Sequence, residues 1–359
     1  MEKTQLRGER VVYLDCLRIL AALAVIFIHS AAQNWDAVRV TSFEWQVFNA
    51  VSSAVRWAVP VFCMISGALL LDNDRPLDLK KLWGTKLLRI VTAFVFWSAL
   101  YALMVYRRGA PAIDAAVAFV KGNYHMWYLY VIAGLYLAAP FLRKITESRK
   151  LTELYLALAF LFTVLLPRAV HFLSCLELPY AAQVLKDAGA YGLGLVNFLF
   201  AHICAFYFVL GHYLHKYEIG PVLRRGGYVL GIAGYVLTVW LTNWHSVGTG
   251  AGSTAFYAEA SLNVFLTAAA VFLFGKYVLA KLEPKGTGLK VLKHLSGCTF
   301  GIYLIHPLVL DILRDALGFS TLAFHPAAGV VLVAVTAAAV SYLLAAVLNR
   351  LPVIGKYIT

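Results

Sequence analysis

The chain has 359 residues, of which 61% are hydrophobic and only 14% charged, and its mean hydropathy is +0.75. Soluble domains keep about 25% charged residues to face water, so this composition excludes an ordinary water-soluble protein. The formal net charge of +13 does not indicate a nucleic-acid-binding protein, because the basic residues do not gather with aromatic residues into one stripe. They lie mostly between apolar segments, as in a membrane protein.

About ten apolar segments are long enough to cross a bilayer, which takes about twenty helical residues. In chain order they are Val12–Ala32, Gln46–Leu71, Leu82–Tyr106, Tyr124–Phe141, Leu151–His171, Leu195–His215, Tyr228–Trp244, Phe256–Leu279, Ser296–Arg314 and Ala327–Arg350. Turn and charge signals, such as the run from Asp72 to Pro76, separate them. The sequence therefore predicts an all-α, polytopic membrane bundle that forms one domain over residues 12–350, with no separate soluble domain.

The lysine and arginine residues predict how the bundle is oriented. With the N-terminus inside, the cytoplasmic loops and span ends carry about three times as many of these residues as the outer ones. This asymmetry predicts that both termini are cytoplasmic.

Neither a cleaved leader nor a metal site is expected. Asp15 and Arg18 interrupt the first apolar segment, whereas the apolar region of a signal peptide carries no charge. The five cysteines show neither CxxC nor combined His/Cys spacing, which predicts packing roles for them.

The first span carries three ionisable residues, Asp15, Arg18 and His29. Each costs about 2.5–3.5 kcal/mol inside a membrane on insertion scales, so each needs a partner or a function. Eleven residues separate Arg18 from His29, which at about 100° per residue places both on one helix face, about 16 Å apart. Asp15 can pair with Arg18 three residues later.

Two interpretations of this polar line stay open. In the first, His29 only hydrogen-bonds a neighbouring helix, while the Arg18 side chain extends toward the cytoplasmic interface. In the second, the line is part of a solvated channel, and His29 transfers protons, for which histidine is suited near neutral pH.

Asp15 and six further polar residues are candidates for contacting a substrate or stabilising an oxyanion. The six are Ser66, His125, Trp127, Glu259, Tyr303 and His306. Each also has a structural interpretation, such as close helix packing at Ser66 and interfacial anchoring at Trp127. A carboxylate at Glu259 suits the dipole at the start of the eighth predicted helix. Tyr303 and His306 are three residues apart and therefore share a helix face.

Several blocks of residues, in a fixed order along the chain, form a recognisable pattern. The blocks are Tyr13 to Arg18 followed after ten residues by His29, Val59 to Gly67, His125 to Tyr130, Leu135-Tyr136 with Pro140, and Gly301 to Pro307. The first block resembles the R-x10-H signature of the membrane acyltransferase-3 family, and the others are similar to later segments of that family. R-x10-H alone is a weak pattern, but the ordered set is much more specific. Within the family, the chain most resembles the stand-alone O-acetyltransferases of surface glycans.

The resemblance implies a reaction and a location. An acyl group, usually acetyl, would move from cytoplasmic acyl-CoA to a hydroxyl of a cell-surface or lipid-linked glycan, in the bacterial cytoplasmic (inner) membrane. On matching positions, it implies that His29 is catalytic and that Arg18 is its partner. The expected partners are acetyl-CoA as donor, a glycan or lipid-linked oligosaccharide as acceptor, and membrane lipid, with no nucleic acid and no metal cofactor.

The family's R-x-x-R motif falls on Lys86-Leu-Leu-Arg89, and the resemblance implies that these two residues bind the cofactor CoA. Here the first position of the motif is lysine instead of arginine. Its ammonium group is a compact charge, whereas the planar guanidinium group of arginine can donate two parallel hydrogen bonds. By their charge alone, Lys86 and Arg89 fit an anion site or a lipid-headgroup anchor at the cytoplasmic mouth.

Two other functions are compatible with the sequence. A glycan or lipid transporter, or flippase, would use Arg18 and His29 as a proton path. A membrane sensor or assembly scaffold would need no acyl donor, so acetyl-CoA binding separates it from the enzyme.

Overall fold

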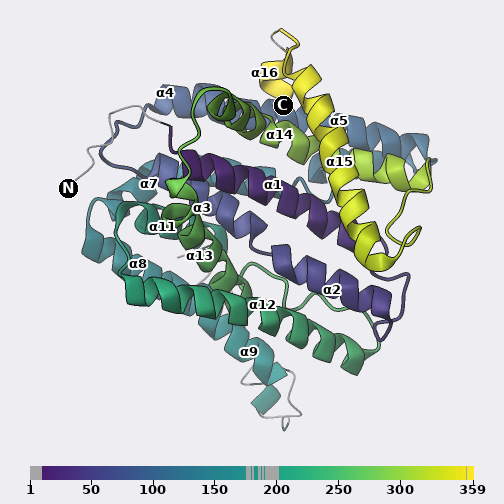
Figure 1. Ribbon diagram of the computed structural model, residues 1–359, viewed down its shortest axis with the longest axis horizontal. Helices are drawn as coiled ribbons and strands as arrows, with labels where there is room; N and C mark the ends of the chain where they lie inside the picture. Colours follow the sequence, from purple (N-terminus) through teal and green to yellow (C-terminus); the bar gives the residue numbers. More distant parts are fainter. Residues whose placement is uncertain are drawn as a thin grey trace.

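The computed structural model describes residues 10–174, 179, 182–184, 187, 190, 202–352 and 354–359, and the ordered elements in this part of the chain are helices (Figure 1). Eight helical segments of the described residues are long and apolar enough to cross a membrane. They are Val12–Ala32, Phe43–Leu70, Leu79–Arg107, Trp127–Thr146, Arg149–Val170, Leu262–Lys281, Gly286–Asp315 and Pro326–Leu348. The all-α polytopic bundle predicted from the sequence is confirmed.

The other two predicted spans fall on α11 (Ile203–Lys216) and α12 (Pro221–Thr249). α11 has 14 residues, and the start of its predicted span lies outside the described residues. α12 has 29 residues, which is about 43 Å of helix at 1.5 Å per residue. It is long enough to span a bilayer, but it is less apolar than the eight segments above.

α1 (Val12–Ala32) lies near the middle of the bundle (Figure 1). It contacts α2 (Phe43–Val55), α3 (Ala58–Leu70), α13, α14 and α15. The elements around it are α13 (Leu262–Tyr277), α14 (Gly286–Asp315) and α15 (Pro326–Leu348). Small residues such as Ala21 and Ala24 are buried in α1, and they let the neighbouring backbones approach closely. This central position brings the polar side chains of α1 against several other helices.

The second predicted span is broken, which corrects the single helix expected over Gln46–Leu71. α2 covers Phe43–Val55, and α3 covers Ala58–Leu70, with a turn at Arg56 and Trp57 between them. Pro60 suits the first turn of a new helix, because the amide it lacks would have no partner there. Unpaired backbone at membrane depth is tolerated only where protein or a cavity surrounds it.

Other boundaries also differ from the prediction. π-helical turns at Leu82–Leu87 and Leu161–Leu165 interrupt the third and fifth spans, between α4 (Leu79–Lys81) and α5 (Leu88–Arg107), and between α8 (Arg149–Phe160) and α9 (Leu166–Ser174). α7 covers Trp127–Thr146 and continues past the predicted end. The short helices α6 (Ala112–Lys121) and α16 (Ile354–Ile358) were not predicted. Hydropathy marks apolar length, but it does not mark a change of hydrogen-bond pattern within an apolar run.

α3 and α11 cross with their backbones in contact, because a glycine of each helix faces the other. A Cβ on Gly67 would lie 1.7 Å from the carbonyl oxygen of Phe208, and one on Gly211 would lie 2.1 Å from that of Met64. Gly67 therefore belongs to a close helix contact, as the packing interpretation of small residues predicts.

Candidate functional site

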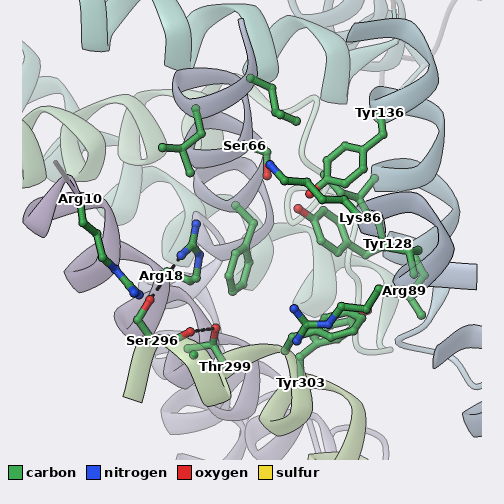
Figure 2. Close-up of a pocket in the computed structure, with 18 residues that line it drawn as sticks. Arg10, Arg18, Ser66, Lys86, Arg89, Tyr128, Tyr136, Ser296, Thr299 and Tyr303 are labelled. Atoms are coloured by element: carbon green, nitrogen blue, oxygen red, sulfur yellow. Dashed lines mark hydrogen bonds between the residues drawn. The ribbon is translucent and has the colours of Figure 1, made fainter. Parts of the chain in front are cut away.

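A cavity of about 370 Å³ lies between α1, α3, α5, α7 and α14 (Figure 2). Four of its lining side chains are cations, Arg10, Arg18, Lys86 and Arg89. Its lining hydroxyls are those of Ser66, Tyr128, Tyr136, Ser296, Thr299 and Tyr303. The cavity is therefore strongly electropositive, and it offers many hydrogen-bond donors.

Asp15 holds Arg18 at the cavity wall. The Asp15 carboxylate is 3% exposed, and it accepts hydrogen bonds from Arg10 Nη2 at 2.9 Å and from Ser296 Oγ at 2.5 Å. Arg18 Nη1 lies 3.3 Å from Asp15 Oδ1 and 3.3 Å from Ser296 Oγ. The pairing of Asp15 with Arg18 predicted from their spacing is confirmed. One carboxylate facing two guanidinium groups leaves the wall positive.

Asp15→Asn should destabilise this wall. The substitution removes the negative charge that pairs with both Arg10 and Arg18. The guanidinium groups then donate to a neutral amide oxygen, which is a weaker acceptor. We expect a loss of about 1–3 kcal/mol, since both arginines are partly open to solvent. Thermal unfolding in detergent checks this, with the exposed Asp78→Asn as the matched control, and an unchanged melting temperature would contradict it.

Lys86 and Arg89 line the opposite wall. Lys86 lies in the π-helical turn before α5, and Arg89 lies in the first turn of α5. Arg89 Nε donates to the main-chain oxygen of Thr359 at 3.1 Å, and its guanidinium lies 5.1 Å from the ring centre of Phe300. These two contacts fix the position of the Arg89 guanidinium group, and Arg89 also lines the cavity.

Three histidines from separate elements meet beside the cavity. The rings of His29 and His306 are stacked with their centres 5.3 Å apart, and the ring of His125 lies 5.3 Å from that of His306. Tyr124 covers His29 at 5.0 Å, and Tyr303 lies 5.2 Å from His125. His29 is on α1, His306 on α14, and His125 in the turn before α7. We call His29, His125 and His306 the histidine cluster.

Tyr303 separates the cavity from the histidine cluster. It lines the cavity, and its ring also contacts His125 and His306 on the other side. Its hydroxyl donates to the backbone carbonyl of His125. His29 does not line the cavity, and Tyr303 lies between the cavity and the histidine cluster.

Arg18 and His29 nevertheless meet the same helix. Arg18 contacts Ser296 and His29 contacts His306, so the two residues of α1 pair with two residues at similar spacing on α14. Both side chains therefore lie on the face of α1 that their eleven-residue separation predicts.

Pro307 explains the local conformation of His306. Proline has no amide hydrogen, so the carbonyl of Tyr303, four residues earlier, loses its helical partner. His306 Nδ1 lies 2.7 Å from this carbonyl oxygen, and 3.3 Å from that of Ile302. Because a carbonyl only accepts, Nδ1 carries the hydrogen. The run from Tyr303 to Pro307 thus fixes both the rotamer and the tautomer of the histidine.

Comparison with known families agrees with the blocks noted in the sequence. The model of the family Acyl_transf_3, described as an acyltransferase domain, matches residues 11–346. The chain belongs to the acyltransferase-3 family. No match was found among curated proteins or among solved structures. The match includes the histidine cluster and every residue that lines the cavity except Arg10. The protein is therefore a membrane acyltransferase.

Three predicted site residues of this acyltransferase lie outside both the cavity and the histidine cluster. Asp15 does not line the cavity itself, but it pairs with Arg10 and Arg18, which do. Trp127 is 41% exposed on the bundle surface. Glu259 does not begin a helix, as the sequence suggested, but lies in the turn before α13, and its carbonyl accepts a hydrogen bond from Tyr207 at 2.8 Å. The capping residue at that helix start is Ser261. Ser66, Lys86, Arg89 and Tyr303 do line the cavity.

The structure also shows polar residues that did not stand out in the sequence. Arg56, in the break between α2 and α3, lies 3.8 Å above the Tyr257 ring. As an ionisable residue inside an apolar span, Arg56 gave the same signal as Arg18. Tyr128 and Tyr136 fall within the family blocks. Ser296 gave no signal, because serine is common in membrane helices.

Proposed function

We propose that this acyltransferase moves an acetyl group from acetyl-CoA to a hydroxyl of a cell-surface or lipid-linked glycan in the bacterial inner membrane. The observation that carries the proposal is the cation-lined cavity that ends at Tyr303, directly beside the cluster that contains His29. Membership of the family indicates an acyl-transfer reaction, and the positive charge of the cavity favours an acyl donor that carries phosphate groups.

The cavity fits a donor of this kind. Phosphate oxygens form strong charge-assisted hydrogen bonds with arginine and lysine, and Arg10, Lys86 and Arg89 offer such donors. Its volume of about 370 Å³ lies in the range of small-molecule sites. The positive-inside asymmetry of the loops favours a cytoplasmic position for the cationic mouth, on the side where acyl-CoA is available.

His29 acts as the general base in this proposal. Its imidazole takes the proton of the acceptor hydroxyl while the hydroxyl oxygen attacks the thioester carbonyl carbon. The carbon–sulfur bond then breaks, and the leaving thiolate takes the proton from His29. Arg18 or Tyr303 donates a hydrogen bond to the oxyanion formed between these steps. An acyl-histidine route would use the same residues and yield the same products.

Comparison of cells with and without the protein tests the proposal. We expect mass spectrometry of their surface glycans to show the loss of one acetyl mass on a defined sugar. Purified protein in lipid nanodiscs should bind acetyl-CoA and release free CoA thiol when the glycan is added. Absence of acetyl-CoA binding would refute the proposed acetyltransferase function. Movement of the glycan across the membrane without acetylation would favour a transporter.

Lys86→Ala and Arg89→Ala should each weaken the binding of acetyl-CoA. Losing a charged hydrogen-bond donor to phosphate costs about 1.5–3 kcal/mol, which is about a tenfold to hundredfold rise in Kd. The matched control is Lys80→Ala, because Lys80 is exposed and does not line the cavity. Isothermal titration at two salt concentrations measures the effect. Equal affinities for Lys86→Ala and Lys80→Ala would remove Lys86 from the donor site.

A further inference from the structure

We propose that His125 and His306 form a subsite for additional hydroxyl groups of the acceptor, so that the acceptor is a polyhydroxylated molecule such as a sugar. This inference rests on the proposed function, and it assigns acceptor selection to two residues other than His29. The subsite adjoins His29, because the His306 ring stacks on the His29 ring and also contacts the His125 ring.

His306 offers an open hydrogen-bond acceptor. Its Nδ1 donates to the carbonyl of Tyr303, so in the neutral imidazole Nε2 carries a lone pair. The side chain is fully buried, and Nε2 has no hydrogen-bond partner among the described residues. Buried polar atoms are nearly always paired, so such an atom points to a ligand or a bound water.

His125 also has unpaired ring nitrogens. It is 2% exposed, and neither ring nitrogen makes a hydrogen bond within the described chain. In a neutral imidazole one nitrogen donates and the other accepts, so His125 offers one open donor and one open acceptor. Together with His306 Nε2, three buried ring nitrogens are left for a ligand.

The unpaired ring nitrogens select a ligand that both donates and accepts hydrogen bonds. An anionic acceptor group presents only lone pairs, so it would leave His306 Nε2 and one nitrogen of His125 without a donor, and it is disfavoured. The thioester group of the donor likewise has no hydrogen to give. Hydroxyl groups donate, and a sugar carries several of them on one rigid ring. One hydroxyl can face His29 while its neighbours donate to His306 and His125. The rings of Tyr124 and Tyr303 supply the apolar walls usual in small-molecule sites.

The choice between a sugar and a simple alcohol tests the subsite. Full-length protein in lipid nanodiscs is given acetyl-CoA with either methyl β-D-glucopyranoside or ethanol, and the ester products are quantified by mass spectrometry. The wild type should favour the glucoside by about tenfold in kcat/KM for each hydroxyl that is bound. His125→Phe keeps the ring contacts but removes both nitrogens, and it should lower the ratio of glucoside to ethanol about tenfold.

His306→Asn is the second variant, in case His125→Phe does not fold, as judged by gel filtration. The amide nitrogen of Asn can still donate to the Tyr303 carbonyl, and the expected fall in the ratio is the same. His294→Phe, outside the cavity and the cluster, is the matched control and should keep the wild-type ratio.

The outcomes separate the two proposals. If wild-type protein consumes no acetyl-CoA with either acceptor, the proposed function fails. If it acetylates both acceptors at similar rates, or if its preference for the glucoside persists in both variants, the function stands and the subsite is refuted.

Discussion

His29→Ala should abolish acyl transfer while the protein still inserts, folds and binds acetyl-CoA. Loss of a general base lowers the rate about 10²–10⁴-fold. His29 does not line the cation-lined cavity, so the donor should bind with unchanged affinity. The expected kinetic signature is therefore a fall in kcat with little change in the KM for acetyl-CoA, because the lost interaction is made only in the transition state.

The measurement is release of CoA thiol together with the mass of the acetylated glycan. His325→Ala is a suitable control, because His325 is exposed, precedes α15 and lies outside the cluster. Wild-type acetylation by His29→Ala would remove His29 from the chemistry. A loss of acetyl-CoA affinity in the same variant would instead move His29 into the donor site.

Gly67→Ala should disrupt the fold rather than the chemistry. The new Cβ would lie 1.7 Å from the carbonyl oxygen of Phe208 and 2.5 Å from its carbonyl carbon, both of which are backbone atoms. No side-chain rotation can relieve such an overlap, so α3 and α11 must separate along their crossing. We expect a cost at or above about 3 kcal/mol, the upper end of overpacking.

Gly134→Ala is the matched control for that substitution. Gly134 also lies within an apolar helix, α7, but a Cβ there would meet nothing within 4 Å. Alanine is about 1 kcal/mol better than glycine in a helix interior, so this variant should be neutral or slightly stabilised. Thermal unfolding and the yield of monodisperse protein in detergent compare the two. Equal stability of both variants would contradict this prediction, because it would mean that α3 and α11 can move apart without loss of stability.

The histidine cluster shows how far the sequence could predict the site. His29 and Arg18 were recognisable from one helix alone, because both are ionisable residues in an apolar span and their spacing fixes a common face. His125 and His306 were visible only as separate polar residues. Nothing in their spacing indicates that both rings touch one another, since 180 residues of chain lie between the segments that carry them.

The role of Tyr303 depended on the structure even more. In the sequence it is one of 20 tyrosines, and it shares a helix face with His306. The structure shows that the Tyr303 side chain lines the cavity and that its ring also contacts the ring of His125.

The sequence by itself determined that the chain is a membrane bundle, where most of its helices run, and which face of α1 is polar. Hydropathy and helical periodicity are local properties, and they follow from the solvent that each segment must meet. The break at Arg56, the backbone contact of α3 with α11, and the meeting of α1, α7 and α14 at three histidines were decided only by the tertiary structure. Each depends on packing and hydrogen bonds between segments that are distant in the sequence. The sequence of one segment does not indicate which other segment it will contact.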